Sequence, residues 1–216
     1  HTSLAWALWR ELQWEDAEKE FKRAIELNPK YATAHHWYSY YLAGSGRMDE
    51  ALVEIKRAEE LNPLSLAIVS DFANILYFAR RYDQALEQCQ KALDLDPNFW
   101  RAHMYFCMSA LHKGRYEEAI TAALKARSLD DNQMVLGWLG YAYAVGGKKN
   151  EAHKILDQLG ELSKTIYGDS YFKALIYAGL GEKDNAFEWL EKGFEDGSTW
   201  LSTLKVDPEC DTLRSD

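Results

Sequence analysis

The segment MDEALVEIKRAEELNP at residues 48–63 carries a pattern that returns along the whole chain. Its alanine at position 51 belongs to a column of alanines spaced 34, 34, 34, 33 and 34 residues apart: Ala17, Ala51, Ala85, Ala119, Ala152 and Ala186. A fixed period of this size is typical of stacked supersecondary units, each too small to bury its apolar face alone. The sequence therefore predicts an array of repeats instead of a single central core.

Neighbouring columns indicate that each repeat is a pair of helices. Ile55 and Ala58 follow Ala51 at spacings of four and three, which place all three residues on one helical face. The proline of the ELNP segment at 60–63 then stops this helix. Glycines just ahead of the alanine column are expected to end the preceding helix in a left-handed conformation, and Arg80 is the exception among them.

These columns resemble the tetratricopeptide repeat (TPR), a helical hairpin of 34 residues with a Leu-Gly pair, a Tyr, an Ala and a Pro at fixed places. WLGYAY at 138–143, followed by Ala152, and the run from Tyr31 to Pro97 carry the resemblance best. It implies an all-α fold, a right-handed α-α superhelix of about six hairpins with a C-terminal capping segment. The expected array is 1–197, with units at about 1–31, 32–65, 66–99, 100–132, 133–166 and 167–197, and a tail at 198–216.

The segment from Gly179 to Asp216 looks like the closing part of TPR arrays in bacterial multidomain regulators. In those proteins the array is joined to a winged-helix, protein kinase or nucleotide cyclase domain, so the resemblance implies the regulatory or scaffolding part of a larger protein. A terminal repeat needs its outer apolar surface covered. We expect the tail to cover the end of the last hairpin with Trp200, Leu201, Leu204 and Leu213.

Composition narrows the choice of partners. The 216 residues carry a formal net charge of −9, which argues against direct nucleic-acid binding because that depends on clustered Lys and Arg. No run of about 20 apolar residues is present, so we expect no membrane span. Cys89, Cys107 and Cys210 show no metal-binding spacing, and free thiols favour a reducing, cytoplasmic compartment, with the periplasm as the alternative.

Candidate catalytic groups are better explained by the repeat. Acidic pairs recur with the period, as in Glu15-Asp16, Asp49-Glu50 and Glu117-Glu118. Acidic residues are favoured in the first turn of every helix, whereas an active site is needed only once, so the recurrence indicates helix N-termini. The glycine pairs lack the remaining residues of dinucleotide or phosphate loops. His35 and His103 occupy equivalent positions, which indicates packing. We predict a non-enzymatic chain without cofactor or metal.

Function is then expected on the surface. In the family that the chain resembles, the first helices of successive hairpins line a concave groove that takes peptides. Carrying the groove columns over to this sequence gives an aromatic and methionine-rich lining, suited to gripping apolar side chains of a protein or peptide partner. Its members are Trp6, Trp9, His36, Tyr40, Ser70, Asn74, Tyr77, Phe78, Arg101, Met104, Met108, His112 and Tyr141.

Two alternatives to peptide binding remain at this point. Apolar surface at the first unit or at the tail favours self-association into a homo-oligomer, which would leave the groove unused. An enzyme would need a group of catalytic residues outside the repeat columns. Two better-known groove types of the family are not expected, because the cluster of Lys, Arg and Asn that clamps a terminal carboxylate and the ladder of asparagines are both missing.

Overall fold

The computed structural model describes residues 1–11, 13–162, 170–198, 201, 204, 206–211, 213 and 214. Over these residues it contains α-helices and the short 3-10 helix at Pro208–Cys210, and no strand. The fold class is therefore all-α, as predicted. The helices are α1 (Thr2–Arg10), α2 (Trp14–Leu27), α3 (Ala32–Gly44), α4 (Met48–Leu61), α5 (Leu66–Phe78), α6 (Tyr82–Leu95), α7 (Trp100–His112), α8 (Tyr116–Leu129), α9 (Gln133–Val145), α10 (Lys149–Leu162), α11 (Ser170–Leu180), α12 (Lys183–Glu195) and η2 (Pro208–Cys210).

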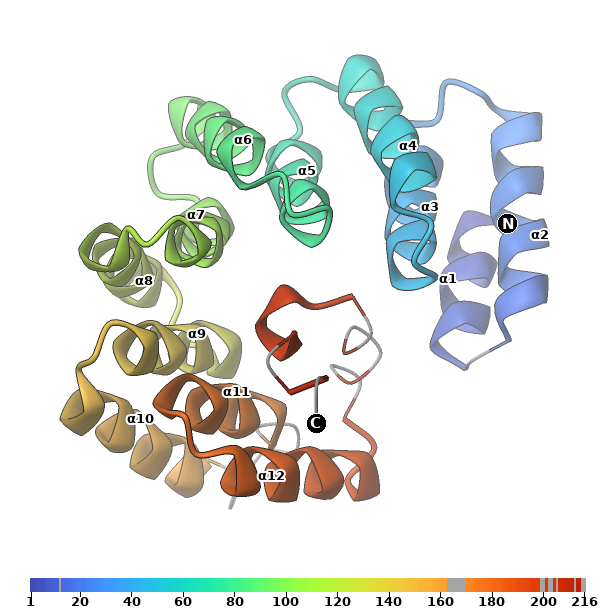
Figure 1. Cartoon of the computed structure of the whole chain (residues 1–216). Coiled ribbons are helices and arrows are strands. Elements are labelled where there is room, and N and C mark those ends of the chain that lie inside the picture. The colour runs from blue at the N-terminus through green and yellow to red at the C-terminus, as the bar shows by residue number, and fades with distance from the viewer. Residues whose placement is uncertain are drawn as a thin grey trace. The chain divides into compact units, whose positions relative to one another are not determined.

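The helices divide into two compact units. Unit 1 comprises residues 1–95 with α1 to α6, and unit 2 comprises residues 96–216 with α7 to α12 and η2. Inside each unit the helices pack as consecutive hairpins, α1 with α2, α3 with α4 and onward, and each hairpin also contacts the next one along the chain (Figure 1). The predicted solenoid of helical hairpins is confirmed.

The alanine column lies where helices cross. None of its six members exposes any surface, and the residues four positions later are buried in the first five hairpins. A small side chain lets two helix backbones approach closely, whereas a larger one in a packed crossing is destabilising by about 1–3 kcal/mol. The regular spacing of alanine in the sequence therefore reports the regular spacing of helix crossings.

From the second hairpin onward, the turn inside each hairpin uses a residue with positive φ. Gly46 has φ +80° and Gly114 has φ +69°, and the same column in the third hairpin holds Arg80 with φ +58°. The amide of the following residue closes the turn onto a carbonyl in the preceding helix, as in Arg47 N to Leu42 O at 2.9 Å and Arg81 N to Leu76 O at 2.9 Å. Glycine enters this left-handed region without a Cβ clash, so Arg80 is a site of local backbone strain.

Two histidines fix the connections between hairpins. His35 Nε2 lies 3.0 Å from the carbonyl oxygen of Pro29, and His103 Nε2 lies 2.9 Å from that of Pro97, six residues earlier in each case. His35 Nδ1 also contacts a carboxylate oxygen of Glu54 on α4 at 2.6 Å, and this hydrogen bond raises the pKa of His35. The predicted packing role is confirmed for His35, and hydrogen bonds to the turn explain why both positions hold histidine.

A carboxylate joins the first two hairpins of unit 1. Glu18 on α2 accepts hydrogen bonds from Lys22 at 2.8 Å, Arg47 at 2.7 Å and Tyr38 at 3.0 Å. Burial by itself would raise the pKa of the Glu18 carboxyl, but these three donors together lower it to about 2. The interaction stabilises the stacking of one hairpin on the next, because Arg47 and Tyr38 belong to the second hairpin.

Candidate functional site

The predicted groove residues all lie on the first helix of a hairpin, but they differ in exposure. Eight of the thirteen are buried: His36, Ser70, Asn74, Tyr77, Phe78, Met104, Met108 and Tyr141. Trp6, Trp9, Tyr40 and Arg101 are half-buried, and His112 is partly exposed. A fully covered side chain such as Tyr77 does not touch a ligand in this state, so the thirteen residues do not form one uniform lining.

Unit 1 brings together an aromatic cluster on its first helices. The Trp6 ring lies 5.0 Å from that of Trp9 and 5.2 Å from that of Trp37, measured between centroids, so the cluster joins α1 to α3. All three tryptophans are half-buried. Trp37 does not belong to the predicted lining. Half-exposed tryptophans in mutual contact provide large, rigid contact area for a partner.

Beside this cluster, two polar pairs join α3 to α5. His36 Nε2 lies 2.9 Å from Asp71 Oδ2, with both side chains nearly buried. The Asn74 amide nitrogen donates to the hydroxyl of Tyr40 at 3.2 Å, while the buried amide oxygen of Asn74 has no hydrogen-bond partner among the described residues. An acceptor left unsatisfied in this way is unusual in folded proteins and marks a place where a donor is missing. We call Trp6, Trp9, Trp37, Tyr40 and Asn74 the aromatic patch.

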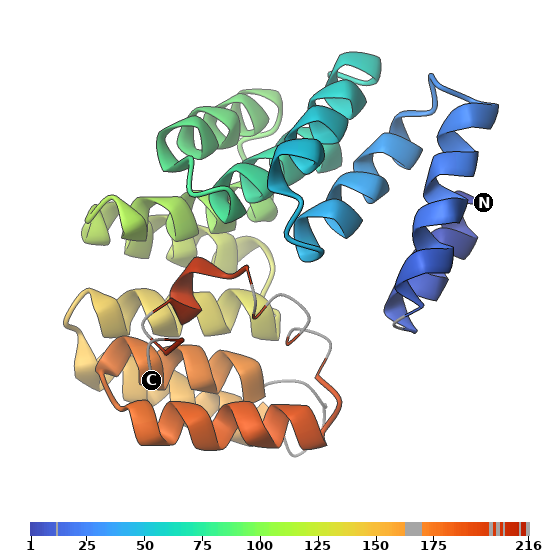
Figure 2. The same cartoon turned by 45° about the vertical axis from the view of Figure 1, so that its right-hand side comes forward.

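The corresponding face of unit 2 is covered by the chain itself. Val206, Asp207, Pro208, Glu209, Cys210 and Leu213 are all buried, and the described part of this segment lies alongside α9 and α11 (Figure 2). We call residues 206–211, 213 and 214 the docked segment. The sequence predicted an open surface here, with the tail covering only the end of the last hairpin.

Part of that expected cap is present. Leu201 lies over α12, where a Cβ added to Gly193 would be 3.7 Å from Leu201 Cδ1. Leu204 is half-buried and Leu213 is buried, whereas Trp200 lies outside the described residues. The tail extends further than predicted, because the Glu209 side chain reaches His112 at the end of α7. Nothing in the local pattern of the tail indicated these distant partners.

The docked segment is anchored by two buried carboxylates. Glu209 Oε1 lies 3.0 Å from His112 Nε2 at the end of α7, and the Tyr141 side chain on α9 hydrogen-bonds the same carboxylate. Asp207 accepts a hydrogen bond from the Tyr171 hydroxyl on α11 and caps its own turn through the Glu209 amide at 3.1 Å. Three successive first helices thus each supply one donor to an acidic turn, which satisfies charges that would be unfavourable if buried alone.

Burial also sets the protonation of the surrounding groups. Desolvation, followed by the charge of Glu209, raises the pKa of Tyr141 well above its usual value, so its hydroxyl keeps its proton and remains a donor. Burial raises the pKa of Cys210 to about 12 and that of Cys107 further still. The described cysteines are free and buried, as expected for Cys89 and Cys107, and are held as neutral thiols.

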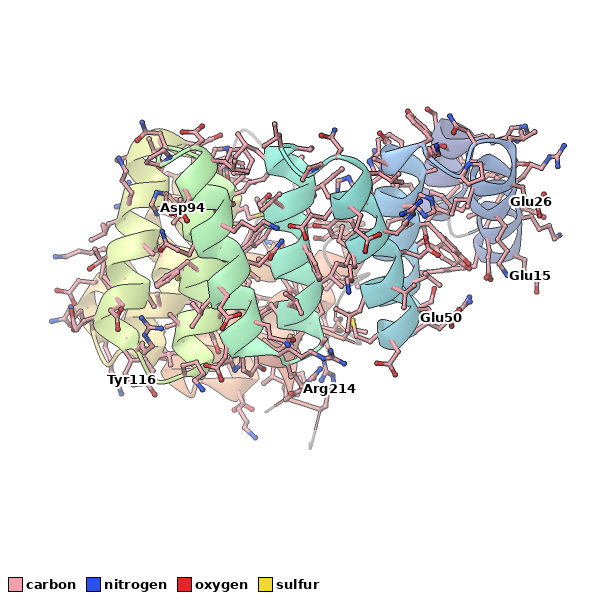
Figure 3. The ribbon with its side chains drawn as sticks, turned by 90° about the horizontal axis from the view of Figure 1, so that it is seen from above. Glu15, Glu26, Glu50, Asp94, Tyr116 and Arg214 are labelled. Carbon is pink, nitrogen blue, oxygen red and sulfur yellow. The ribbon has the colours of Figure 1, made fainter. Side chains whose placement is uncertain are left out.

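The acidic pairs considered as catalytic candidates occupy the first turns of second helices. Glu15 and Glu50 are exposed, and they point away from the helices that carry them (Figure 3). Their position confirms the prediction that these acidic pairs belong to the N-terminal turns of helices. Among the described residues, no group of three or more His, Cys, Asp or Glu side chains is placed to hold a metal ion. None of the described helices has the length and apolarity needed to cross a bilayer.

A fold of stacked helical hairpins, with a polar and aromatic face on its first helices, defines a helical-repeat module for protein interaction. Such scaffolds are typically non-catalytic. Family models described as tetratricopeptide repeat match residues 2–65 and 70–133, and a further one matches residues 170–195, which together exceed half of the chain. The chain belongs to the tetratricopeptide repeat family.

Solved structures give the same fold. A TPR protein from Parabacteroides merdae ATCC 43184 has a TM-score of 0.75 at 15% identity, covering 96% of this chain and 82% of that one. The thermophilic TPR protein TTC0263 of Thermus thermophilus has a TM-score of 0.71 at 19% sequence identity, and the match covers 83% of this chain and 96% of that one. PilW, described as a type IV pilus biogenesis factor, has a TM-score of 0.70 at 16% sequence identity, and the match covers 99% of this chain and 96% of that one. Comparison with curated proteins gives no match.

Proposed function

We propose that this protein binds a peptide segment of a partner protein through the aromatic patch of unit 1. The observation that carries the proposal is the half-exposed cluster of Trp6, Trp9 and Trp37, which lies on the first helices of two successive hairpins. Tryptophan and tyrosine dominate binding energy at protein interfaces because they bring large contact area with few rotatable bonds. Apolar side chains of the partner would pack against these rings.

Asn74 supplies a polar contact for the same ligand. Its amide nitrogen is engaged with Tyr40, so the buried amide oxygen is the atom that would accept a hydrogen bond from a peptide N–H once the ligand reaches it. Extended peptides expose one N–H per residue, which matches an acceptor placed beside an aromatic surface. The ligand that fits best is a peptide with apolar side chains and at least one free backbone donor.

The experiment selects peptides from a random displayed library on the full chain and measures their affinity for variants. We expect Trp37→Ala to weaken binding about ten-fold or more, as for a central interface residue. Phe194→Ala is the matched control, because Phe194 is 81% exposed on α12 and lies outside the patch. Selected peptides that bind Trp37→Ala as tightly as the wild type, while thermal unfolding is unchanged, would contradict the proposal.

Self-association is the second candidate function. Phe187 and Phe194 are spaced seven residues apart on α12, which places them on one helical face, and both are exposed. Exposed apolar residues in such an arrangement favour contact with another surface. Light scattering at increasing protein concentration distinguishes the two functions. A molar mass that rises with concentration for the wild type, but stays at the monomer value for Phe194→Ser, supports a homo-oligomer.

The wider context rests on resemblance alone. Residues 179–216 resemble the end of arrays in bacterial multidomain regulators, and we propose on this basis that the module recruits or senses a partner for such a regulator. The expected result is that the module, linked to its neighbouring domain, changes the output of that domain when a selected peptide is added. An output that ignores the peptide would contradict the regulatory role without affecting the binding proposal.

A further inference from the structure

The docked segment shows what kind of ligand the first-helix face of unit 2 accepts. It is a tight turn with the sequence Val206-Asp-Pro-Glu-Cys210, in which η2 follows directly on Asp207 and the Asp207 carboxylate caps the Glu209 amide. Arg214 closes the turn from the other side by donating to the carbonyl oxygens of Leu204 at 2.7 Å and Asp207 at 2.6 Å. The segment holds its own shape through these internal hydrogen bonds.

The receptor for this turn is built from three hairpins. His112 of α7 and Tyr141 of α9 bind the Glu209 carboxylate, and Tyr171 of α11 binds the Asp207 carboxylate. The Glu209 side chain is only 1% exposed, so its carboxylate is shielded from solvent where it meets these donors. The side chain of Cys210, the next residue after Glu209, is also buried and interacts with Tyr171.

Docking through buried carboxylates distinguishes this segment from an ordinary hydrophobic cap. Apolar contacts would hold a permanent cap without any need to desolvate charge, whereas buried charged groups confer specificity for a partner with matching geometry. Two carboxylates two residues apart, fixed by one turn, match three donors on successive helices. The geometry is that of a ligand in a binding site.

We propose that the first-helix face of unit 2 is a second binding site, specific for an acidic turn in a partner protein, and that the docked segment occupies it as an intramolecular competitor. The partner presents two carboxylates at the spacing of Asp207 and Glu209, and it displaces the docked segment when it binds. The docked segment belongs to the same chain as its receptor, so it competes intramolecularly with any external peptide. An external peptide therefore binds the intact protein weakly and a protein with a weakened segment strongly.

The test uses a fluorescent peptide with the sequence of residues 204–214, LKVDPECDTLR, and a control peptide LKVNPQCDTLR that lacks both carboxylates. Anisotropy is measured under reducing conditions with two full-length proteins, the wild type and a variant carrying Asp207→Asn and Glu209→Gln. We expect the acidic peptide to bind the variant about ten-fold or more tightly than the wild type, because the competing segment is weakened. The control peptide binds neither protein.

The receptor side is tested by adding His112→Ala to the variant. We expect this change to abolish binding of the acidic peptide, while Trp37→Ala in the same background leaves it unchanged because Trp37 belongs to unit 1. The second site is therefore tested independently of the aromatic patch. Equal affinity of the acidic peptide for wild type and variant, or equal binding of both peptides, would overturn the proposal.

The wild-type protein provides a second measurement that does not depend on folding of the variant. Hydrogen exchange of the docked segment is followed in the presence of excess unlabelled peptide. We expect the acidic peptide to accelerate exchange at Glu209 and Cys210, whose amides lie in the docked turn, and the control peptide to leave it unchanged. Exchange that is unaffected by the acidic peptide at millimolar concentration would refute displacement.

Discussion

Glu209 and His112 are 97 residues apart in the sequence, and their side chains meet at 3.0 Å. This contact brings the end of the chain onto the first helix of unit 2, past the two hairpins that lie between them. The protein uses its last described residues to fill a surface that, in an array of hairpins, is otherwise available to partners. The first-helix face of unit 2 is therefore covered by described residues of the chain itself.

The first prediction concerns the stability of that contact. Glu209→Ala removes the acceptor that His112 and Tyr141 share, and we expect the free energy of unfolding to fall by about 1–3 kcal/mol. Urea denaturation followed by far-UV circular dichroism measures the change. Asp211→Ala is the control, because Asp211 is exposed and its ion pair with Arg214 lies at the surface. Equal stability of the two variants would show that the Glu209 carboxylate is not an anchor.

The second prediction is a pH dependence caused by Glu18. Its pKa is about 2 in the folded protein, below the ordinary value of 4.5, because the opposing effect of burial is outweighed by hydrogen bonds from Lys22, Arg47 and Tyr38. A lowered pKa means that the contribution to stability is complete above pH 4.5 and is lost as the pH falls toward 2. We expect the free energy of unfolding to fall by about 1–2 kcal/mol over this pH range, a value that allows for the partial exposure of Glu18 and its donors.

The measurement compares the wild type with Glu18→Gln by urea denaturation at several pH values. The variant keeps the shape of the side chain but has no charge to lose, so its stability should fall less between pH 4.5 and 2. Glu26→Gln is a suitable control, because Glu26 lies on the same helix and its ion pair with Arg23 is exposed. Parallel curves for wild type and Glu18→Gln would show that Glu18 does not link the two hairpins.

The third prediction concerns the Leu-Gly pair of the fifth hairpin. A Cβ on Gly140 would collide with Ile176 on α11 and lie 2.8 Å from Ile155 Cγ2 on α10. Gly140→Ala should therefore destabilise the protein by about 1–3 kcal/mol through overpacking. Gly160→Ala makes the same chemical change on α10 with nothing within 4 Å, and should stabilise by about 0.5–1 kcal/mol through helix propensity. Thermal unfolding of both variants checks the opposite signs.

The fourth prediction concerns the strained turn of the third hairpin. Arg80 has φ +58° where other hairpins have glycine, so Arg80→Gly should raise stability by about 0.5–1 kcal/mol. Arg80→Ala keeps the backbone strain and removes the hydrogen bond from Arg80 Nη1 to the Phe78 carbonyl, and it should not stabilise. A glycine variant less stable than the wild type, measured by thermal unfolding, would show that contacts of the arginine side chain outweigh the strain.

Parts of the candidate site could be read from the sequence, because the repeat assigns each residue to a helical face. Trp6, Trp9 and Tyr40 were identified in this way and are half-buried on the first helices of unit 1. Trp37 was missed as a site residue, because its position is not among the groove columns carried over to this sequence. Tyr77 and Met104 were included but are fully covered, because a face assignment does not say what packs upon it.

The sequence by itself determined the local architecture of this protein. Helix lengths, the buried alanine column and the left-handed turns depend on residues close together in the chain, and the nearly constant period repeats those local interactions along it. The tertiary structure alone decided which surfaces stay free. Contacts such as His36 with Asp71 and His112 with Glu209 join residues 35 and 97 positions apart. Such pairings depend on how hairpins stack and where the tail folds back, and neither is encoded in the pattern of a single repeat.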